Sequence, residues 1–461
     1  MSTNLLLLGV LSNSLGARHI SNSHDNGFSS VAIDSRAVKE GALFFALKGS
    51  NCDGHSFVAG AFSSGARAAV VCESALESFN LIDIAKNAGK DLIVVPNTLK
   101  GLQDSARVYL EKFPSLLKIG ITGSSGKTTT KEITAAIISA EKNTIMNKGN
   151  LNSETGLPLS VFEVRSEHEV GVFELGMNRH GEILEIADVL KPNVALVTNI
   201  GSAHIEYFGN KERIVDEKKC IFNFLQNDDI AIVPANDEFK EKLTLGVNAK
   251  IKYFGQNCFK ELEGTKSLGL EGTEITWAGE KINFALPGKH NLDDAFAAIA
   301  IAKEVCVGNK AIKQGLESVK PLFGRLEILK GRTTVIRDCY NANPESTEKS
   351  VEFCDSVEWP GRKAYVIADM LELGICSIAE HQKLGKLLAE SSAEKIFLFG
   401  SEITASIENL QKNEKDFFHT NNIDDLSREL NGYVRNGDLV LLKGSRGCAL
   451  ERLTQMLTGA D

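Results

Sequence analysis

The stretch LKIGITGSSGKTTTKE, from Leu117 to Glu132, decides the fold around which the rest of the chain is arranged. Its first residues, through Ile121, are mostly apolar and are typical of a buried strand. Gly123 and Gly126 permit a tight turn, and the residues from Lys127 onward are typical of a helix. A strand, a glycine turn, a Gly-Lys-Thr triplet and a helix together predict a phosphate-binding loop.

The chemistry of such a loop predicts that the protein binds ATP and Mg²⁺. Backbone N–H groups of the glycine turn face a polyphosphate, and the helix N-terminus adds a favourable dipole. We expect Lys127 to reach the β- and γ-phosphates and the Thr128 hydroxyl to bind Mg²⁺. The spacing is a variant, because Ile121 stands where the usual pattern has its first glycine. A turn that binds no nucleotide is the alternative.

Composition narrows the class of protein. A chain of 461 residues with 43% hydrophobic and 24% charged residues is ordinary globular protein, long enough for two to four domains. The net charge of −9 argues against nucleic acid as the main partner. The nine cysteines form no C-x-x-C pair, which disfavours a zinc site or disulfides and fits the cytoplasm. No apolar run reaches the roughly 18–20 residues of a membrane span. We interpret the early LLLLGVL as a packed helix.

The first third, which we assign as residues 1–113, contains strands in FSSVAIDSR, GALFFALKG and ARAAVV, with a helix in HSFVAGAFSSGA. Ser35 and Arg36 directly follow the first of these strands. An arginine beside a small hydroxyl suits a diphosphate or a nucleotide base, and a plain surface turn is equally compatible with the pattern. Pro114, just before the phosphate-loop strand, marks the boundary.

Residues 114–326 form the predicted central domain. Glu174 ends the strand-like EVGVFELGM, and the carboxyl ends of parallel strands are where ligands and Mg²⁺ bind. His204 follows the next strand, where a loop cap is the alternative because hard cations prefer oxygen. Lys218 lies on a helix, where a solvated charge is the default. A polar loop that either caps turns or binds a ligand contains Asn150, Asn152 and Thr155.

Residues 327–461 again alternate strand and helix signals, which predicts a second, doubly wound sheet. Polar residues gather just after the predicted strands, where the binding face of such a sheet lies. They include Asp338, Tyr340, Asn343, Lys443, Ser445 and Arg446. No Gly-x-Gly-x-x-Gly fingerprint is present, so a nicotinamide cofactor is not expected.

Taken in order, these motifs resemble the Mur ligases, the ATP-dependent amide-bond ligases of peptidoglycan precursor synthesis. DSRAVKEGALFFALKG and DGHSF are similar to the family's uridine-nucleotide-binding domain. GITGSSGKTTTKE, ELGMNRHGEI, NIGSAHIEYFG, EKKCIF and GKHNLDDA are similar to its central ATPase domain. YNANPES, ADMLELG and LLKGSRG are most similar to the member that adds D-alanyl-D-alanine to UDP-N-acetylmuramoyl-tripeptide, and the DNPR string of the diaminopimelate-adding member is absent.

The resemblance implies an α/β fold of three domains: a small α/β N-terminal domain, a central P-loop ATPase-type parallel sheet and a C-terminal Rossmann-like doubly wound domain. Its catalytic and metal-binding residues map to Lys127, Thr128, Glu174, His204 and Lys218, the last matching a lysine that is carbamylated in several relatives. Its ATP contacts map to Gly123, Ser124, Ser125, Gly126, Lys127, Thr128, Thr129, Asn291, Arg325 and Asp338. Its substrate contacts map to Ser35, Arg36, Asn150, Asn152, Thr155, Tyr340, Asn343, Lys443, Ser445 and Arg446.

The implied reaction consumes ATP and joins UDP-MurNAc-tripeptide to D-Ala-D-Ala through an acyl phosphate, with Mg²⁺ as cofactor. The resemblance also implies a cytoplasmic monomer that closes around its substrates. Two alternatives remain open on the sequence. One is a related ligase, either another Mur-type enzyme or a folylpolyglutamate synthetase. The other is a P-loop ATPase that works in a complex and forms no amide bond.

Overall fold

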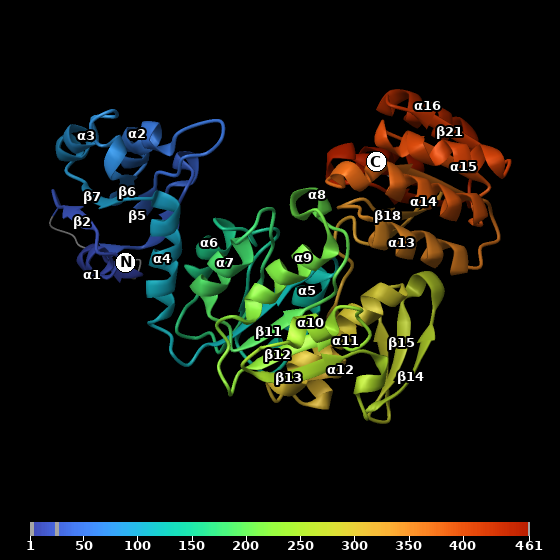
Figure 1. The fold of residues 1–461 in the computed structure, drawn as a ribbon, viewed down its shortest axis with the longest axis horizontal. Helices are drawn as coiled ribbons and strands as arrows, with labels where there is room; N and C mark the ends of the chain where they lie inside the picture. Colours follow the sequence, from blue (N-terminus) through green and yellow to red (C-terminus); the bar gives the residue numbers. More distant parts are fainter. Residues whose placement is uncertain (1–3, 24–26, 460–461) are drawn as a thin grey trace.

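A computed structural model describes residues 4–23 and 27–459 and contains three α/β parts arranged in chain order. Figure 1 shows the blue N-terminal part at the left, the green and yellow central part in the middle and the orange and red C-terminal part at the right. The N- and C-terminal parts both lie along the upper edge of the central part. The predicted α/β class with three parts is confirmed.

The N-terminal part is built on a five-stranded sheet of order β2-β7-β6-β5-β4, in which β2 alone is antiparallel to its neighbour. A short antiparallel pair, β1 and β3, lies beside it. The elements are β1 (Leu6–Leu7), α1 (Leu8–Ser14), β2 (Arg18–Ile20), β3 (Gly27–Phe28), β4 (Ser30–Ala32), β5 (Ala42–Phe45), α2 (Val58–Ser63), β6 (Ala68–Cys72), α3 (Leu81–Ala88), β7 (Asp91–Val95) and α4 (Thr98–Leu110).

The central part contains a six-stranded, fully parallel sheet of order β13-β12-β11-β8-β10-β9 and a three-stranded antiparallel sheet of order β14-β15-β16. Its strands are β8 (Leu117–Thr122), β9 (Thr144–Met146), β10 (Val170–Glu174), β11 (Val194–Val197), β12 (Ile230–Pro234), β13 (Lys250–Phe254), β14 (Leu262–Ser267), β15 (Thr273–Trp277) and β16 (Glu280–Phe284). Its helices are α5 (Lys127–Ser139), α6 (Gly156–Val161), α7 (Glu182–Leu190), α8 (Ile205–Phe208), α9 (Lys211–Lys219), α10 (Lys240–Thr244), α11 (Lys289–Glu304) and α12 (Asn309–Ser318).

The C-terminal part has a six-stranded sheet of order β17-β18-β22-β19-β20-β21, in which only the edge strand β17 is antiparallel. Its strands are β17 (Glu327–Lys330), β18 (Thr334–Asp338), β19 (Lys363–Ala368), β20 (Lys395–Phe399), β21 (Phe417–Thr420) and β22 (Leu439–Lys443). Its helices are α13 (Pro344–Ser356), α14 (Ser377–Glu390), α15 (Ile407–Lys412), α16 (Ile423–Tyr433) and α17 (Thr454–Thr458).

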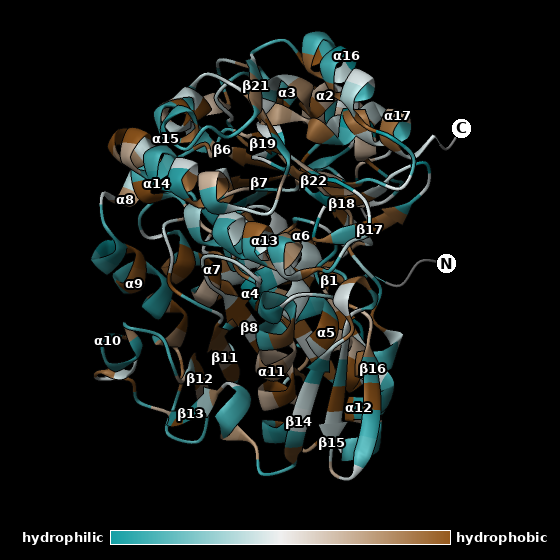
Figure 2. Cartoon of the chain, turned by 90° about the vertical axis from the view of Figure 1, so that its right-hand side faces the viewer, coloured by the Kyte–Doolittle hydropathy of each residue, from teal (hydrophilic) through white to brown (hydrophobic). Residues whose placement is uncertain are grey.

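The strand β8 lies in the middle of the central sheet, paired in parallel with β10 on one side and β11 on the other. Its position follows from its sequence, because Ile119 and Ile121 are fully buried and a strand covered on both faces must be apolar. In Figure 2 hydrophobic residues concentrate on the strands, while hydrophilic ones lie on outer helices such as α12 and α16. The carboxyl ends of β8, β10 and β11 therefore share one edge, where the candidate residues gather.

One expectation about an element needs correction. LLLLGVL is not one helix, because Leu6 and Leu7 form β1, which pairs with β3, and the helix α1 begins only at Leu8. The strands β15 and β16 form a hairpin, which β14 extends to three strands. The domain boundaries after residues 113 and 326 stay predictions. No helix among residues 4–23 and 27–459 is both long and apolar enough to span a membrane.

Candidate active site

The predicted phosphate-binding loop connects β8 to α5. Gly126 adopts a left-handed conformation with φ of +77°, and a Cβ there would lie 2.1 Å from the Asp294 carboxylate, so only glycine fits. Gly123 is equally restricted, because a Cβ would lie 1.8 Å from the Thr198 hydroxyl. The backbone N–H of Ser125 donates to the Asn199 side chain at 3.0 Å, which anchors the loop to the end of β11. The sequence-predicted strand, turn and helix are confirmed.

Lys127 and Lys218 meet beneath this loop. The Lys127 ammonium donates to the Gly123 carbonyl at 2.8 Å, and the Lys218 amine donates to the same oxygen at 2.8 Å. Burial lowers the pKa of Lys127, against the opposing effect of the Glu174 carboxylate. Burial and then the charge of Lys127 hold the pKa of Lys218 well below its ordinary value. Both amines therefore donate to one backbone carbonyl, and the charge of Lys127 disfavours the charged form of Lys218.

Glu174 lies at the carboxyl end of β10 and is almost fully buried. Its Oε1 accepts a hydrogen bond from the Asn152 amide at 2.6 Å, while its Oε2 is buried and accepts none from the described residues. An unpaired buried carboxylate oxygen is costly unless a ligand completes it. The described residues contain no cluster of three or more His, Cys, Asp or Glu that could hold a metal. A Mg²⁺ ion here therefore fits only with hydroxyl, phosphate or water oxygens beside Glu174.

His204 directly precedes α8, in a left-handed conformation with φ of +63°. Its Nδ1 lies 2.7 Å from the Glu372 carboxylate of the C-terminal part. A hydrogen bond from His204 lowers the pKa of Glu372. The imidazole thus bridges the central and C-terminal parts while also bordering the cavity described below.

Arg325 contacts the helix that follows the phosphate-binding loop, and Lys443 pairs with a buried carboxylate at a C-terminal strand end. The Arg325 guanidinium donates to the Thr128 hydroxyl at 2.9 Å and lies 4.2 Å from the centre of the Tyr340 ring. The Lys443 ammonium donates to the buried Asp338 carboxylate at 2.7 Å. Burial would raise the pKa of Asp338, but Lys443 outweighs it and the pKa is lowered.

These residues line one cavity of about 500 Å³ between the central and C-terminal parts. The sequence-predicted residues that line it are Ser124, Ser125, Gly126, Lys127, Thr128, Thr129, Asn150, Asn152, Glu174, His204, Asn291, Arg325, Asp338, Tyr340, Asn343 and Lys443. The predicted residues outside its lining are Gly123, Lys218, Ser35, Arg36, Thr155, Ser445 and Arg446.

The excluded residues have identifiable alternative contacts. Arg36 is exposed on a turn of the N-terminal part and pairs with Asp34 at 2.6 Å. Arg446 pairs with Glu451 at 2.8 Å, and the Ser445 hydroxyl accepts a hydrogen bond from the Leu371 N–H. Among the described residues, none before Ser124 lines the cavity, so the N-terminal part does not reach it in this arrangement.

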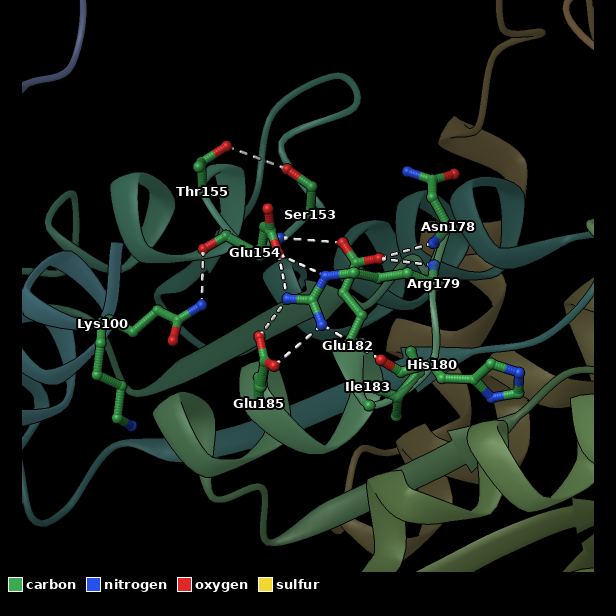
Figure 3. Close-up of polar contacts among 12 residues, drawn as sticks. Lys100, Ser153, Glu154, Thr155, Asn178, Arg179, His180, Glu182, Ile183 and Glu185 are labelled. Carbon is green, nitrogen blue, oxygen red and sulfur yellow. Dashed lines mark hydrogen bonds and ion pairs between the residues drawn. The ribbon is translucent and has the colours of Figure 1, made fainter. Parts of the chain in front are cut away.

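The loop that contains Asn150 and Asn152 is held by ion pairs and hydrogen bonds around Arg179, which Figure 3 shows. The Arg179 guanidinium pairs with Glu154 of this loop and with Glu185 of α7, its Nη1 donating to Glu185 at 3.0 Å. The buried Glu182 carboxylate accepts from the Asn178 N–H at 2.7 Å. These contacts fix the loop beside Glu174, although their residues stood in no predicted site.

Several cavity residues were missed by sequence reasoning. Asn236 and Asp237 follow β12, and the Asp237 carboxylate accepts from the Ile200 N–H at 3.0 Å. The strand-end rule that identified Glu174 would have found them. His290, Asp294 and Lys349 lie on helices and gave no comparable signal. Burial lowers the pKa of His290 to about 4, so its imidazole is neutral.

Comparison with known proteins assigns the family. Family models match residues 28–109 as "Mur ligase family, catalytic domain", 121–302 as "Mur ligase middle domain" and 324–446 as "Mur ligase, glutamate ligase domain". The chain is 38% identical over 444 residues to a UDP-N-acetylmuramoyl-tripeptide–D-alanyl-D-alanine ligase of Treponema pallidum, covering 96% of each protein. The chain belongs to the Mur ligase family.

Solved Mur ligase structures agree with this membership. The fold superposes on a crystal structure of MurF from Acinetobacter baumannii with a TM-score of 0.88 at 29% identity, covering 98% of both chains. It superposes on MurF from Thermotoga maritima in complex with ADP with a TM-score of 0.79 at 27% identity, covering 93% of this chain and 97% of the other. As a Mur ligase, the protein is an ATP-dependent ligase, and the alternative of an ATPase that forms no amide bond is set aside.

Proposed function

We propose that this Mur ligase joins D-alanyl-D-alanine to UDP-N-acetylmuramoyl-tripeptide, with conversion of ATP to ADP and phosphate. One observation carries the proposal: the phosphate-loop residues of the central part and the strand-end residues of the C-terminal part line a single cavity. The relative that is 38% identical over nearly the whole chain has this reaction as its name, which supports this member over a folylpolyglutamate synthetase.

The chemistry requires that the carboxylate be activated, because joining a carboxylate to an amine in water is unfavourable. The γ-phosphoryl group of ATP is transferred to the terminal carboxylate of the tripeptide, which gives an acyl phosphate and ADP. The dipeptide amine then attacks the acyl carbon, loses a proton, and inorganic phosphate leaves. Lys127 and Arg325 are cations in the cavity wall that stabilise the phosphoryl oxygens during both steps.

Residues that would hold Mg²⁺ are Glu174, through its unpaired buried Oε2, and the Thr128 hydroxyl. The ion, when bound, neutralises phosphate charge and orients the transferred group. His204 borders this site but is paired with Glu372, which favours a role as close neighbour. Glu174 is oriented by Asn152, so that loop links the metal site to the expected position of the tripeptide.

Lys218 is proposed to be carbamylated. Its lowered pKa favours the neutral amine, which is the form that adds CO₂ and releases a proton. The carbamate would place an anion beside Lys127, where the neutral amine of Lys218 otherwise lies. Intact-protein mass spectrometry in bicarbonate, with Lys218→Arg as control, tests this. An adduct that persists in Lys218→Arg would refute the assignment.

The remaining assignments complete the proposal. Residues 1–113 bind the uridine nucleotide with Ser35 and Arg36, residues 114–326 bind ATP, and residues 327–461 bind the dipeptide near Tyr340, Asn343, Lys443, Ser445 and Arg446. Because the N-terminal part does not line the cavity here, substrate binding must bring the bound tripeptide carboxylate to it. We propose that the enzyme acts as a monomer in the cytoplasm.

The deciding experiment is mass spectrometry of products formed from ATP, D-Ala-D-Ala and a panel of UDP-tripeptides, with folate plus glutamate as the competing pair. The proposed ligase forms UDP-pentapeptide only from the first set. Lys127→Ala is expected to melt at the wild-type temperature and to lose ligation, because it removes the cation at the phosphate loop. Retained ligation in the purified variant would reject the loop assignment.

A further inference from the structure

A carboxylate of the C-terminal part accepts hydrogen bonds from the loop that follows β11. Glu345, in the first turn of α13, places both carboxylate oxygens 3.0 Å from the backbone nitrogen of Ser202, and its Oε1 accepts from the Ser202 hydroxyl at 2.9 Å. Lys211 lies 3.1 Å from the same carboxylate. A Cβ on Gly201 would lie 3.0 Å from the Glu345 carboxyl carbon, so the approach is close. The contact joins residues 143 positions apart in the chain.

The loop that follows β11 is also hydrogen-bonded to the phosphate-binding loop. The Gly201 N–H donates to the Ser124 hydroxyl at 2.8 Å, and that hydroxyl donates to the Gly201 carbonyl at 3.1 Å. The Ser124 N–H donates to the Asn199 carbonyl at 3.0 Å. Ser124 is buried and lines the cavity. Hydrogen bonds on either side of the Gly201–Ser202 peptide therefore connect Glu345 to the loop that faces ATP.

At the Glu345 end of this connection, the start of α13 is fixed by a helix cap. Asn343, which lines the cavity, caps α13 by accepting from the Ser346 N–H at 2.8 Å, while the Ser346 hydroxyl accepts from the Asn343 N–H at 3.1 Å. Burial would raise the pKa of Glu345, but the hydrogen bonds from Ser202 outweigh it and the pKa is lowered. Glu345 is thus a fixed anion at neutral pH, two residues from a cavity-lining side chain.

We propose that Glu345 is a positioning residue that couples docking of the C-terminal part to the conformation of the phosphate-binding loop through Ser202, Gly201 and Ser124. The proposal rests on the proposed function only in taking ATP as the ligand of that loop. With the C-terminal part docked, Glu345 fixes Ser202 and so orders Ser124. By thermodynamic reciprocity, a nucleotide that needs the ordered loop favours docking to the same extent.

A merely structural contact makes a different prediction. If Glu345 only stabilises the fold, its removal lowers the melting temperature and leaves nucleotide affinity unchanged. If it positions the loop, its removal weakens nucleotide affinity in the free enzyme, before any peptide is bound. Glu348 offers a matched control, because it lies on the same helix α13 with an exposed side chain.

The first experiment measures the dissociation constant of ADP for the full-length protein by calorimetry, with no peptide substrate. Glu345→Ala is expected to weaken ADP binding about tenfold, since a lost charge-assisted contact is of that order. Glu345→Gln is expected to give a smaller loss, because one carbonyl oxygen can still accept from Ser202, and Glu348→Ala is expected to match wild type. Unchanged ADP affinity in folded Glu345→Ala overturns the proposal. This readout does not depend on which peptide the enzyme ligates.

The second experiment is a double-mutant cycle with Ser202→Ala, which keeps the backbone N–H and removes the hydroxyl that Glu345 accepts from. Ser202→Ala is expected to weaken ADP binding by a few-fold, and Glu345→Gln is expected to add less in its presence than in wild type. Additive losses overturn the proposed connection. If Glu345→Ala does not fold, the Glu345→Gln and Ser202→Ala pair alone decides. In ligation, the positioning role predicts that the KM for ATP rises more than kcat falls.

Discussion

The central part makes two interfaces of opposite character. Toward the N-terminal part it is mainly apolar: α4 packs on α6 and α7, Tyr109 and Phe162 lie 5.3 Å apart between ring centres, and one buried core spans both parts. Ion pairs from α4 to Asp188 lie at its edge. Toward the C-terminal part its contacts are largely polar: Glu345 lies on Ser202, His204 lies beside Glu372, and Arg325, in the segment that connects the two parts, lies on Thr128. Ile205 adds a smaller apolar contact with the C-terminal core.

The difference indicates which interface opens. Separating an apolar core exposes surface at roughly 25 cal/mol per Å², with nothing to replace it. Polar contacts exchange with water at a small net free energy, about 1 kcal/mol each. We therefore expect the N-terminal and central parts to unfold together, and the C-terminal part to adjust when ligands bind. Each prediction below tests one side of this contrast.

The largest effect is expected from Tyr109→Ala, in the apolar interface. Tyr109 is 1% exposed and its ring packs on both Phe162 and Phe113. Large-to-small changes of a buried aromatic residue cost about 3–5 kcal/mol. Urea unfolding followed by circular dichroism should show the N-terminal and central parts losing stability together. A free energy of unfolding for Tyr109→Ala equal to that of wild type would contradict the shared core.

The polar interface should respond through activity. Arg325→Ala removes the donor to Thr128 and the stack on Tyr340, so kcat/KM for ligation is expected to fall about a hundredfold, the range seen for one lost charge-stabilising donor. The melting temperature should change by about 2 °C or less, since the side chain is half-buried at a solvated boundary. Arg325→Lys keeps the charge but not the planar fork, and it should recover only part of the rate. A large loss of stability in Arg325→Ala would place this residue with the apolar interface instead.

The sequence could predict features that depend on neighbouring residues, but not contacts between the parts. The strand, loop and helix from Leu117 onward and the strand-end position of Glu174 could be predicted, because each depends on residues that are adjacent in the sequence. The pairing of Glu345 with Ser202 could not be predicted, since it depends on how two separate sheets are oriented. The default expectation of a solvated charge at Lys218 is wrong, because its side chain is buried and its amine donates to the Gly123 carbonyl. The metal-site role that the resemblance implies for it stays a prediction.

The N-terminal part shows the same limit. Ser35 and Arg36 follow a strand as expected, yet the sequence does not contain the distance from that strand to the cavity. The ion pairs around Arg179 were likewise not predicted, because Glu154 and Glu185 are far apart in the sequence and each is typical of a solvated charge. Local elements were predictable; contacts between elements were not.

A buried acid at the polar boundary gives a pH-dependent effect. Asp294 is 7% exposed, accepts from the Thr130 hydroxyl at 3.3 Å, and has a pKa raised well above its ordinary value by burial, despite Lys349 and Arg325. The folded protein therefore holds this proton more tightly than the unfolded chain. Stability is lost as pH rises above the unfolded pKa near 4 and continues to fall until the folded pKa is passed.

Asp294→Asn removes this titration while keeping the shape of the group. Thermal melts at a series of pH values should show the melting temperature of Asp294→Asn rising relative to that of wild type as the pH increases from about 4 toward neutral. Asp293→Asn is the graded comparison on the same helix: burial also raises the pKa of Asp293, but Asp293 is less buried, so a smaller effect is expected. A stability difference between Asp294→Asn and wild type that is constant with pH would mean that Asp294 is ionised in the folded protein.

The smallest effect is expected where a polar contact lies within the apolar interface. The Tyr109 hydroxyl donates to the Val164 carbonyl at 2.6 Å, but that carbonyl also accepts from Arg165 at 2.7 Å. In Tyr109→Phe the carbonyl keeps a partner, so no buried acceptor is left unpaired and the loss should be below about 1 kcal/mol. Arg165, which also donates to the hydroxyl at 3.2 Å, retains the Phe162 carbonyl as well. If the free energy of unfolding lost in Tyr109→Phe approached that lost in Tyr109→Ala, the hydroxyl rather than the ring would stabilise the interface. The contrast between an apolar and a polar interface would then be wrong.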